Sequence, residues 1–460
     1  MTSVSDEYNH LCPNEAINKA RNLWLSAEKE SDLIKVENLY RYALKTSKRE
    51  KKRRKKQREQ GKTEDIDNED IDEDIYFEDD DATEINEKEK MMNKKSKRKL
   101  ESDTCLKTAD CKKACEKLAL LLCQSGRTKK AKALLSRLGY VCRLSSAVLD
   151  YNPQKDEEKN THKTSNNDRP REIEVDPKGT EMPGRTDAPG LILDGFISKK
   201  EIQHLCSIFK SPTANYWIDH QYAVEPPSPY FSYILSLENT SQFGFVGTLV
   251  NKIFNSEKLR RKFPKLKNAT KVEMWAHNRP HASGHQMHFD SDDEGKNGIR
   301  NPIMSTIIFI TAGCGGPSLL TSQRLTDVQL ARKGWLCYPK SERLVAFDGK
   351  YLHGVIPGKG VQSGRRVTLM FAFWSDICVR EADGPGSARP FPLKDSNCEW
   401  AKELTLKKSP VNSSGGASDK DENSIEVDPL FIDRVYETLG GKRWSKSKGF
   451  PEYDAVFQGF

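Results

Sequence analysis

Eight short apolar runs between residues 272 and 374 place the strongest constraint on the fold. Gly, Pro, Asn and Asp separate the runs, and these residues favour turns. Runs this short suit strands better than helices, and strands at such close spacing predict a β-sandwich or a β-barrel. The eight runs cover residues 272–276, 286–290, 305–310, 318–320, 334–338, 344–347, 353–356 and 366–374.

Helical patterns precede these strands. The segment Leu191–Phe209 opens with an apolar, strand-like run that leads into a helix. Ser198 precedes the helix and Glu201 follows three residues later, which is the pattern of a capping box. Ser241–Phe254 has the apolar spacing of a second helix. These helices should buttress the strands, so we predict an α+β domain.

Two helical pairs are predicted in the N-terminal third of the chain. Residues 14–28 and 33–46 form the first pair, and the second lies within 108–138, where Gly126 separates its helices. The pairs resemble tetratricopeptide hairpins, with Glu37–Lys45 (ENLYRYALK) the closest stretch. Such repeats usually need about three units for stability, so a small helical bundle is an equal alternative. Stacked helix pairs are also a candidate surface for a protein partner.

Blocks of like charge separate the two helical pairs. Lys48–Arg58 carries nine basic residues, Glu64–Asp81 carries twelve acidic residues, and Lys94–Lys99 is basic again. Like charges repel and cannot bury a core, so we expect residues 48–103 to be disordered. The basic blocks suit a nuclear import signal or an acidic partner. A solvated segment that neutralises its own acidic neighbour is the alternative.

The pattern divides the chain into six segments. Residues 150–188 are polar and are expected to form a linker. After residue 378 the pattern is mixed, with a short helix expected at Pro429–Leu439. The predicted segments are a helical hairpin at 1–47, a disordered segment at 48–103, a second hairpin at 104–149, a linker at 150–188, a strand-rich domain at 189–378 and a C-terminal extension at 379–460.

The composition of the chain indicates in which cellular compartment the protein is expected. Hydrophobic residues make up 36% of the chain and charged residues 31%, with a net charge of +8 and 11 cysteines. Neither an N-terminal apolar run nor a stretch of about eighteen apolar residues occurs, so we expect no secretion signal and no membrane span. Without a C-x-x-C pair, the odd number of cysteines fits reduced thiols. We expect an intracellular protein of the nucleus or the cytoplasm.

Histidine and aspartate gather in Gly284–Asp293 (GHQMHFDSDD). Residues two apart on a strand project from the same face, so His288 and Asp290 should point together. The only histidine after them is His353, at the start of a later apolar run. Two histidines and one carboxylate form the facial triad of non-haem Fe(II) oxygenases, which leaves positions open for a co-substrate and oxygen. A His-x-Asp motif alone is weak evidence for a metal site. The metal centre is predicted from His288, Asp290 and His353 together, in this order along the chain.

An arginine is suitably placed to hold the co-substrate. Arg366 opens the last long strand, thirteen residues after His353. Arginine pairs with a carboxylate through two parallel hydrogen bonds. With Thr368 on the same face of the strand, Arg366 would hold the distal carboxylate of 2-oxoglutarate. Arg365 should point away and is the alternative anchor if the strand is shifted by one residue.

These motifs resemble the Fe(II)/2-oxoglutarate-dependent dioxygenases, and within them the prolyl 4-hydroxylase-type catalytic domain. The resemblance covers residues 189–378 and is carried by LILDGFISKKEI, ASGHQMHFD, GCGGPSLLT and YPKSERLVAFDGKYLHGVIP. It implies a double-stranded β-helix, also called a jelly roll, with His288, Asp290 and His353 as catalytic iron ligands and Arg366 as the 2-oxoglutarate anchor. It implies Fe(II), 2-oxoglutarate and O2 as reaction partners, with ascorbate as a candidate accessory reductant.

Two departures from the family pattern stand out. The loop between His353 and Arg366 is longer than usual in the family. The tyrosine that the family often carries shortly before the first ligand, in contact with 2-oxoglutarate, is replaced here by Ala276, His277 and Asn278.

The resemblance implies hydroxylation of a protein side chain, with a prolyl residue as the first expectation and a lysyl residue as an alternative. Nucleic acid is a further alternative, but base-repair oxygenases carry a second arginine where this chain has Ala372. A helical-repeat adaptor with an inactive oxygenase domain is a third, and the intact triad counts against it.

The remaining polar residues near the triad are expected to play lesser roles. We expect the other nearby histidines to lie in loops or on the substrate side, with one of them, His285, facing away from His288. The nearby acidic residues should form a solvated loop. The residues concerned are His277, His281, His285, Asp292, Asp293 and Glu294.

Overall fold

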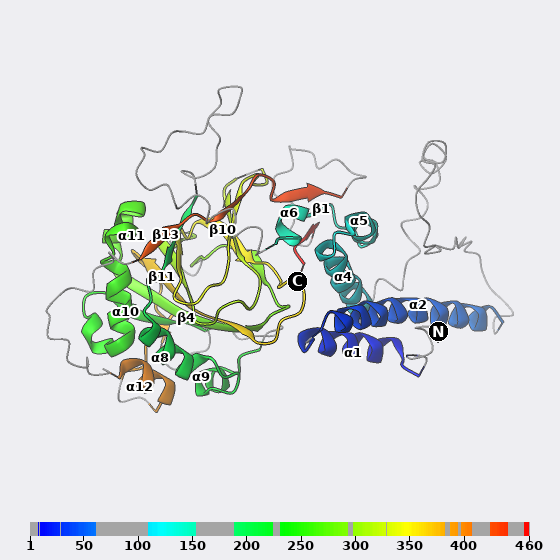
Figure 1. Cartoon of the computed structure of the whole chain (residues 1–460), viewed down its shortest axis with the longest axis horizontal. Coiled ribbons are helices and arrows are strands. Elements are labelled where there is room, and N and C mark those ends of the chain that lie inside the picture. The colour runs from blue at the N-terminus through cyan, green and yellow to red at the C-terminus, as the bar shows by residue number, and fades with distance from the viewer. Residues whose placement is uncertain are drawn as a thin grey trace, which may run out of the picture.

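The computed structural model shows a strand-rich barrel with helices packed on either side (Figure 1). The described residues are 8, 10–27, 29–60, 109–152, 188–223, 231–292, 298–327, 329–381, 387–393, 397–406, 424–439 and 455–459. The predicted disorder of residues 61–103 and the predicted linker at residues 153–187 lie outside the described part of the chain.

The N-terminal region contains the two predicted helical hairpins. Helices α1 and α2 pack against each other, as do α4 and α5, and α2 contacts α4 across the two pairs (Figure 1). The elements of this region are α1 (Pro13–Leu25), α2 (Glu30–Gln60), α4 (Ala109–Gln124), α5 (Thr128–Arg137), β1 (Cys142–Leu144) and α6 (Ser146–Leu149). The resemblance of these hairpins to tetratricopeptide repeats stays a prediction.

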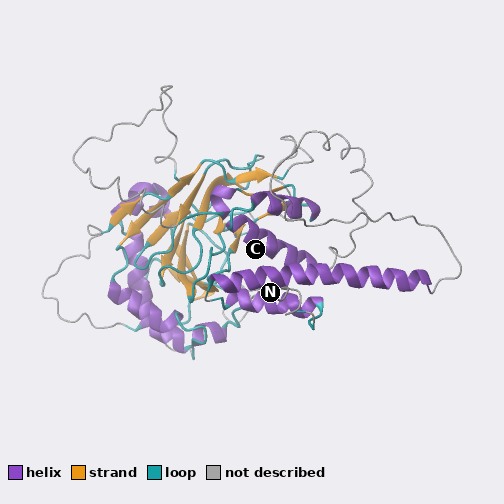
Figure 2. Cartoon of the chain, turned by 45° about the vertical axis from the view of Figure 1, so that its right-hand side comes forward, coloured by secondary structure: helices purple, strands orange, loops and turns teal. Residues whose placement is uncertain are grey.

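Helix α2 is longer than predicted. It continues to Gln60, so the disordered segment expected from residue 48 is wrong for residues 48–60. Lys, Arg, Glu and Gln are good helix formers, and Gly61 is the first helix breaker in the sequence. Figure 2 shows the helix running out past its neighbours. Like charge alone therefore does not end a helix that is already formed.

The strand-rich domain contains a large and a small sheet. The large sheet has the strand order β12-β3-β4-β11-β6-β9-β2-β13, and the small sheet has the order β14-β8-β7-β10-β5. The strands of the large sheet are β2 (Gly190–Asp194), β3 (Tyr233–Ser236), β4 (Lys271–Pro280), β6 (Met304–Phe309), β9 (Leu344–Phe347), β11 (Arg365–Trp374), β12 (Arg389–Pro390) and β13 (Ile425–Val427). Those of the small sheet are β5 (His285–His288), β7 (Ser318–Arg324), β8 (Gly334–Cys337), β10 (Tyr351–Val355) and β14 (Leu430–Ile432).

The eight strands from β4 to β11 wind between the two sheets. Strands β4, β6, β9 and β11 belong to the large sheet, and β5, β7, β8 and β10 belong to the small one. Their pairings are antiparallel. Side chains from both sheets meet in one interior cluster, which includes Phe309, Trp335 and Phe347. This winding is a double-stranded β-helix, so the predicted α+β jelly-roll fold is confirmed.

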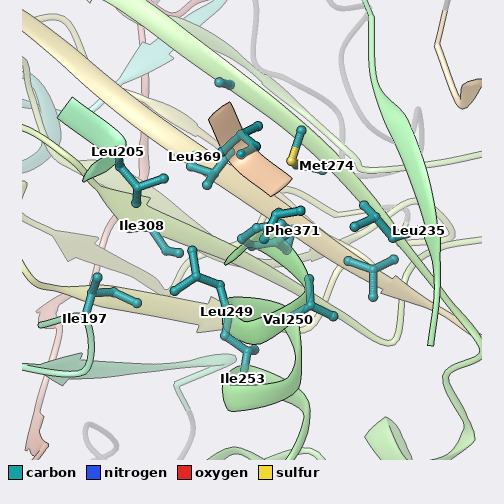
Figure 3. Packing of buried hydrophobic residues seen from close by; sticks show 14 of the residues in the cluster. Ile197, Leu205, Leu235, Leu249, Val250, Ile253, Met274, Ile308, Leu369 and Phe371 are labelled. Atoms are coloured by element: carbon teal, nitrogen blue, oxygen red, sulfur yellow. The ribbon is translucent and has the colours of Figure 1, made fainter. Parts of the chain in front are cut away.

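Helices that precede β4 cover the outer face of the large sheet. The predicted capping box is present at the start of α8, where Ser198 and Glu201 bond each other's backbone N–H groups. Figure 3 shows Leu249, Val250 and Ile253 of α10 packed near Leu369 and Phe371 of β11. The helical elements of this domain are α8 (Lys199–Phe209), α9 (Asn215–Asp219), η3 (Thr240–Phe243), α10 (Gly244–Phe254), α11 (Glu257–Lys262), η4 (Pro264–Asn268) and α12 (Glu399–Thr405).

The N-terminal region covers the outer face of the small sheet. Leu120 of α4 belongs to the same buried cluster as Met287 of β5 and Leu352 of β10. A three-stranded sheet with the order β15-β1-β16 joins this region to the last part of the chain. Its C-terminal strands are β15 (Tyr436–Thr438) and β16 (Val456–Phe457). The helical hairpins and the small sheet of the barrel therefore share one hydrophobic cluster.

The helix expected at Pro429–Leu439 is wrong, because this segment contains strands β14 and β15. Strand β14 pairs with β8, and β15 pairs with β1. Partners far away in the sequence thus override the local helical tendency. Among the described residues, no helix combines the length and the apolar character that crossing a membrane requires.

Candidate metal centre

The two predicted histidine ligands lie on neighbouring strands of the small sheet. His288 is the last residue of β5, and His353 lies in the middle of β10. The two residues are direct partners in the antiparallel register, and their ring centroids are 4.4 Å apart. The sheet pairing therefore brings together two imidazoles that are separated by 64 residues in sequence.

Asp290 completes the group from just beyond the end of β5. Its Oδ1 atom lies 3.6 Å from Nε2 of His288 and 3.5 Å from Nε2 of His353. The other carboxylate oxygen accepts a hydrogen bond of 2.6 Å from the Ser305 hydroxyl. The Asn301 side chain donates to the backbone carbonyl of Asp290 at 2.6 Å. These two contacts orient the carboxylate so that one oxygen faces both histidines.

Backbone carbonyls fix the orientation of both imidazoles. Nδ1 of His288 lies 2.8 Å from the carbonyl oxygen of Gln286, and Nδ1 of His353 lies 3.0 Å from that of Tyr351. A carbonyl can only accept a hydrogen bond, so each Nδ1 carries a proton, and Nε2 of each ring is the atom that faces Asp290. Metal-binding histidines commonly have this arrangement.

Asp290 and His353 also shift each other's ionisation. Burial opposes the charge on Asp290, but His353 and His288 outweigh it and hold the pKa of this carboxyl well below its ordinary value. Burial lowers the pKa of His353, but the neighbouring Asp290 carboxylate raises it overall. The carboxylate is therefore ionised at neutral pH.

This donor set fits a metal ion of the Fe(II) type. One ligand atom from each of His288, Asp290 and His353 lies within 4.8 Å of the others. Two imidazoles and one carboxylate form the facial triad of non-haem iron sites. Nε2 of His353 is buried without a hydrogen-bond partner in the described part of the chain, as expected for a nitrogen that coordinates a metal ion. The His288 side chain is 31% exposed, which leaves one side of the group open.

The predicted arginine lies on the opposite sheet and points into the same interior. Arg366 is 2% exposed, and its guanidinium lies 5.0 Å from the centre of the Phe309 ring. Phe309 belongs to the interior cluster, as does Phe347, whose ring lies 4.6 Å from that of His353. His353 of the metal group and Arg366 therefore both contact rings of the same interior cluster.

Among the described residues, no carboxylate forms an ion pair with Arg366. Its Nη2 atom donates to the Ser318 hydroxyl at 2.9 Å, while its Nε atom and the Thr368 hydroxyl are buried without partners in the described residues. Burial, reinforced by Arg279, lowers the pKa of Arg366 to about 9, so it remains charged at neutral pH. A buried cation without a carboxylate partner is costly unless an anion binds beside it.

A glycine makes room for this arginine. A Cβ atom at Gly315 would lie 2.5 Å from Cδ of Arg366, and the residue has a φ of +83°. Any larger residue would both strain the backbone and collide with the arginine side chain. The motif GCGGPSLLT therefore positions Arg366 as well as forming a turn.

The structure confirms the predicted register of the last strand. Arg365 bonds to Asn278, with its Nη2 atom donating to the Asn278 carbonyl oxygen at 2.7 Å. Arg366 instead lies in register with Arg279 and projects from the other face of β11. Arg366 and Thr368, two residues apart on β11, thus project from the same buried face of this strand.

The prediction that His285 faces away from His288 is wrong. The two rings lie 4.6 Å apart, and the His277 ring lies 5.1 Å from that of His285. The pairing of β5 with β10 shifts in register between His353 and Val355, which allows two residues three apart to turn to one side. No sequence signal revealed this shift. His277 and His285 thus line the site next to the metal group.

The predictions for His281 and Asp292, two other residues near the metal group, have different outcomes. His281 follows the end of β4, as the loop prediction expects, and its ring accepts from the Gly315 backbone N–H at 2.9 Å. Asp292 is not solvated, because it is buried and pairs with Arg300 at 2.5 Å. Its partner lies across the loop and could not be recognised from the local run of acidic residues. Asp293 and Glu294 lie outside the described residues.

Tyr222 reaches the site from an element that the sequence did not connect with it. It follows α9, and its hydroxyl oxygen accepts from the backbone N–H of Asn278 at 3.2 Å. The same oxygen lies 3.5 Å from Nδ1 of His277. A tyrosine hydroxyl thus approaches β4 at the position where the strand itself carries a histidine.

Known proteins resemble this chain only in part. No family model matches it, and no curated protein does. A prolyl 4-hydroxylase from Pseudomonas putida aligns with 41% of this chain and 93% of its own, at 14% identity and a TM-score of 0.26. A viral collagen prolyl hydroxylase from Paramecium Bursaria Chlorella virus-1, in a 2-oxoglutarate complex, aligns with 41% of this chain and 96% of its own, at 16% identity and a TM-score of 0.25.

A third solved structure contains a substrate peptide. It is a prolyl hydroxylase from Trichoplax adhaerens, bound to a fragment of the hypoxia inducible factor oxygen degradation domain. It aligns with 41% of this chain and 84% of its own, at 11% identity and a TM-score of 0.25. TM-scores of this size do not establish a shared function, which has to follow from the side chains of this chain.

Proposed function

We propose that the chain is an Fe(II)/2-oxoglutarate-dependent dioxygenase that hydroxylates a protein side chain, in the first place a prolyl residue. The main support for the proposal is that two groups, each of which lacks a binding partner, face the interior between the two sheets. One is a metal-ligand set of His288, Asp290 and His353. The other is the buried, unneutralised cation of Arg366, on the sheet opposite the two histidines.

The three ligand residues would hold Fe(II) by one face. His288 and His353 offer Nε2 atoms whose direction is set by carbonyl oxygens, and Asp290 offers the oxygen that Ser305 leaves free. When bound, Fe(II) and 2-oxoglutarate supply the coupling of O2 reduction and co-substrate decarboxylation to C–H hydroxylation. The protein's part is to position the reactants and to exclude competing reactions.

Arg366 would bind the distal carboxylate of 2-oxoglutarate. Its guanidinium can give two parallel hydrogen bonds, and the Thr368 hydroxyl on the same face can give a third. Binding would neutralise the buried arginine and satisfy both unpartnered atoms. The co-substrate would then extend from the large sheet toward the metal ligands on the small one.

Apolar side chains shield this space from water. Phe309 lies against Arg366, and Phe347 lies against His353. Both rings are buried and come from the large sheet. A dry interior strengthens the charge interactions of the co-substrate and limits uncoupled oxidation.

The prolyl assignment is supported by the resemblance of the iron-site motifs to prolyl 4-hydroxylases. The N-terminal hairpins add a surface that can capture a partner protein. Lysyl hydroxylation uses the same triad and is the main alternative. A nucleobase substrate is less well supported, because Ala372 is a buried residue where base-repair oxygenases carry a second arginine.

A peptide array separates these substrates. Purified protein with Fe(II), 2-oxoglutarate and ascorbate would be offered matched peptides that contain proline or lysine, and products would be read by a mass gain of one oxygen atom. We expect oxidation of proline and peptide-dependent formation of succinate. Oxidation confined to lysine or to nucleobases would overturn the prolyl assignment, and absence of any 2-oxoglutarate turnover would overturn the oxygenase itself.

The basic clusters support a nuclear location as a separate proposal. Lys48–Arg58 lies at the end of helix α2, which projects beyond its neighbours (Figure 2). A tagged protein should enrich in the nucleus, and neutralising this cluster together with Lys94–Lys99 should shift it to the cytoplasm. An unchanged distribution would leave the clusters as a solvated segment or a partner site.

A further inference from the structure

Strand β5 carries an iron ligand and lies at the edge of its sheet. It contains four residues, ends at His288 and pairs on one side with β10. On its other side, the backbone N–H of Met287 donates to the side-chain oxygen of Gln458 at 2.8 Å. A short edge strand has few bonds to hold it, so this contact with the end of the chain bears directly on the position of His288.

Gln458 is itself held by the N-terminal region. The preceding residue, Phe457, belongs to β16, which pairs in parallel with β1 and places Phe457 beside Arg143. Phe457 is 2% exposed, and its ring lies 5.5 Å from that of Tyr140. Gln458 is also buried. Phe457 and Gln458 therefore connect the N-terminal region with β5.

Gly459 follows Gln458 at a position where α4 leaves little room for a side chain. It has a φ of +90°, and a Cβ atom there would lie 3.0 Å from a methyl group of Leu120 on α4. The turn at Gly459 follows directly after Gln458. A larger residue would strain the backbone and press on the helix, so glycine suits the position.

The same helical region also holds the segment that follows His353. The Gln124 side chain donates to the carbonyl oxygens of Pro357 at 3.2 Å and Gly358 at 3.3 Å. The Tyr151 hydroxyl donates to the Pro357 carbonyl at 3.3 Å and accepts from the Lys359 backbone N–H at 2.9 Å. Strand β5 and the segment that follows β10 are therefore both bonded to residues outside the barrel.

We propose that Gln458 is a positioning residue for the iron site, acting through the backbone of Met287 to fix the strand that presents His288. The inference rests on the proposed function, because it assumes that His288 binds the metal. Removing the acceptor would leave a buried backbone N–H unsatisfied or let β5 shift. Either change would move His288 relative to Asp290 and His353.

Three substitutions in the full chain test this role. Gln458→Leu keeps the size of the side chain but removes the acceptor, and Gln458→Glu keeps an oxygen at the same place. Gln458→Asn is a milder change that shortens the side chain by one methylene. Ser136→Ala is the matched control, because the Ser136 hydroxyl bonds the Leu439 carbonyl at 3.3 Å, between the same helical region and the C-terminal segment but away from β5.

The measurement is Co(II) binding, followed by its d–d absorption and compared with thermal unfolding of each variant. Supporting interactions around metal ligands typically contribute about 10- to 100-fold in metal affinity, so we expect Gln458→Leu to weaken Co(II) binding by at least about tenfold and to alter the spectrum. Gln458→Asn should fall between Leu and wild type and remains informative if Gln458→Leu does not fold. Gln458→Glu and Ser136→Ala should bind Co(II) as the wild type does.

Two outcomes would overturn the inference while leaving the proposed function intact. In the first, Gln458→Leu and Gln458→Asn bind Co(II) with wild-type affinity and spectrum. In the second, Gln458→Glu is as impaired as Gln458→Leu, which would show that the acceptor is not what matters. Failure of the wild-type protein to bind Co(II), or binding that persists in His353→Ala, would instead overturn the proposed metal site.

Discussion

The two sheets of the barrel carry different halves of the proposed chemistry. The small sheet carries the proposed iron ligands His288 and His353, whereas the large sheet carries Arg366 and Thr368, the proposed contacts of the co-substrate. They also differ in what covers their outer faces. Helices α8 and α10, which precede β4 in sequence, cover the large sheet. Segments from both ends of the chain cover the small sheet.

This difference indicates where the site depends on distant parts of the chain. The co-substrate half is supported by packing within one continuous domain. The metal half is supported by residues that are separated from it by more than a hundred positions, such as Gln124 and Gln458. Changes in the helical hairpins should therefore affect metal binding before they affect co-substrate binding.

The largest loss of metal binding and activity is expected when one of the proposed metal ligands is removed. His353→Ala should abolish both Co(II) binding and 2-oxoglutarate turnover, because a facial triad with two remaining ligands holds iron poorly. Circular dichroism should show that the fold is retained. Arg366→Gln is the comparison on the other sheet and should still bind Co(II). Full turnover in His353→Ala would be incompatible with the assignment of this residue.

The sequence predicted the local features of both halves. The short apolar runs predicted the barrel strands, and the order of His288, Asp290 and His353 predicted a group that the structure brings together, whereas the metal-binding role of the group stays a proposal. These predictions succeed because strand alternation and turn residues act over a few positions. The sequence shows the order of these residues along the chain but not the distances between them in space. Strand pairing then brings them together.

The rest depends on contacts between segments far apart in sequence. The segment predicted as a helix at Pro429–Leu439 forms strands because β8 and β1 pair with it. The shift between β5 and β10 that turns His285 toward His288 is set by the facing strand. The burial of Gln458 depends on a surface made by α4 and β1. The residues around each of these segments in the sequence carry no signal that identifies these distant partners.

Two matched leucines compare the covers of the two sheets. Leu120 on α4 and Leu249 on α10 are both 0% exposed and lie in different clusters. Truncation of either to alanine should cost about 2–5 kcal/mol of unfolding free energy, measured by chemical denaturation. Only Leu120→Ala should also weaken Co(II) binding, because Leu120 supports the chain end at Gly459. Equal loss of metal affinity in both variants would show that the covers do not differ in this respect.

A buried glutamate on the large sheet makes stability depend on pH. Burial raises the pKa of Glu273 from 4.5 to about 7, although a hydrogen bond from Ser232 opposes the shift. A raised carboxyl pKa means that the folded state favours the protonated form. The contribution is fully present below the unfolded value of 4.5 and is lost as the pH rises through about 7.

Glu273→Gln tests this effect. A shift of this size corresponds to about 3 kcal/mol, so the variant should gain up to that much stability relative to wild type between pH 5 and pH 8. Denaturant unfolding of the metal-free proteins at the two pH values gives the comparison. Glu238→Gln is the control, since Glu238 is exposed just beyond β3. If the wild type and Glu273→Gln lost stability in parallel, Glu273 would not be the source of the pH dependence.

The smallest effect is expected in the co-substrate half, where one contact is removed while the metal group stays intact. Arg366→Gln deletes a charge-assisted contact worth about 1.5–3 kcal/mol, so 2-oxoglutarate should bind roughly tenfold to hundredfold more weakly. Calorimetry on Mn(II)-loaded protein measures this directly, and the co-substrate analogue 2-oxobutyrate, which lacks the distal carboxylate, should bind the wild type and the variant equally. Arg365→Gln is the matched control, because Arg365 bonds Asn278 on the other face of β11. A larger loss in Arg365→Gln than in Arg366→Gln would mean that the large sheet presents its anchor from the opposite face, and a loss of Mn(II) binding in Arg366→Gln would mean that the two halves are not separable.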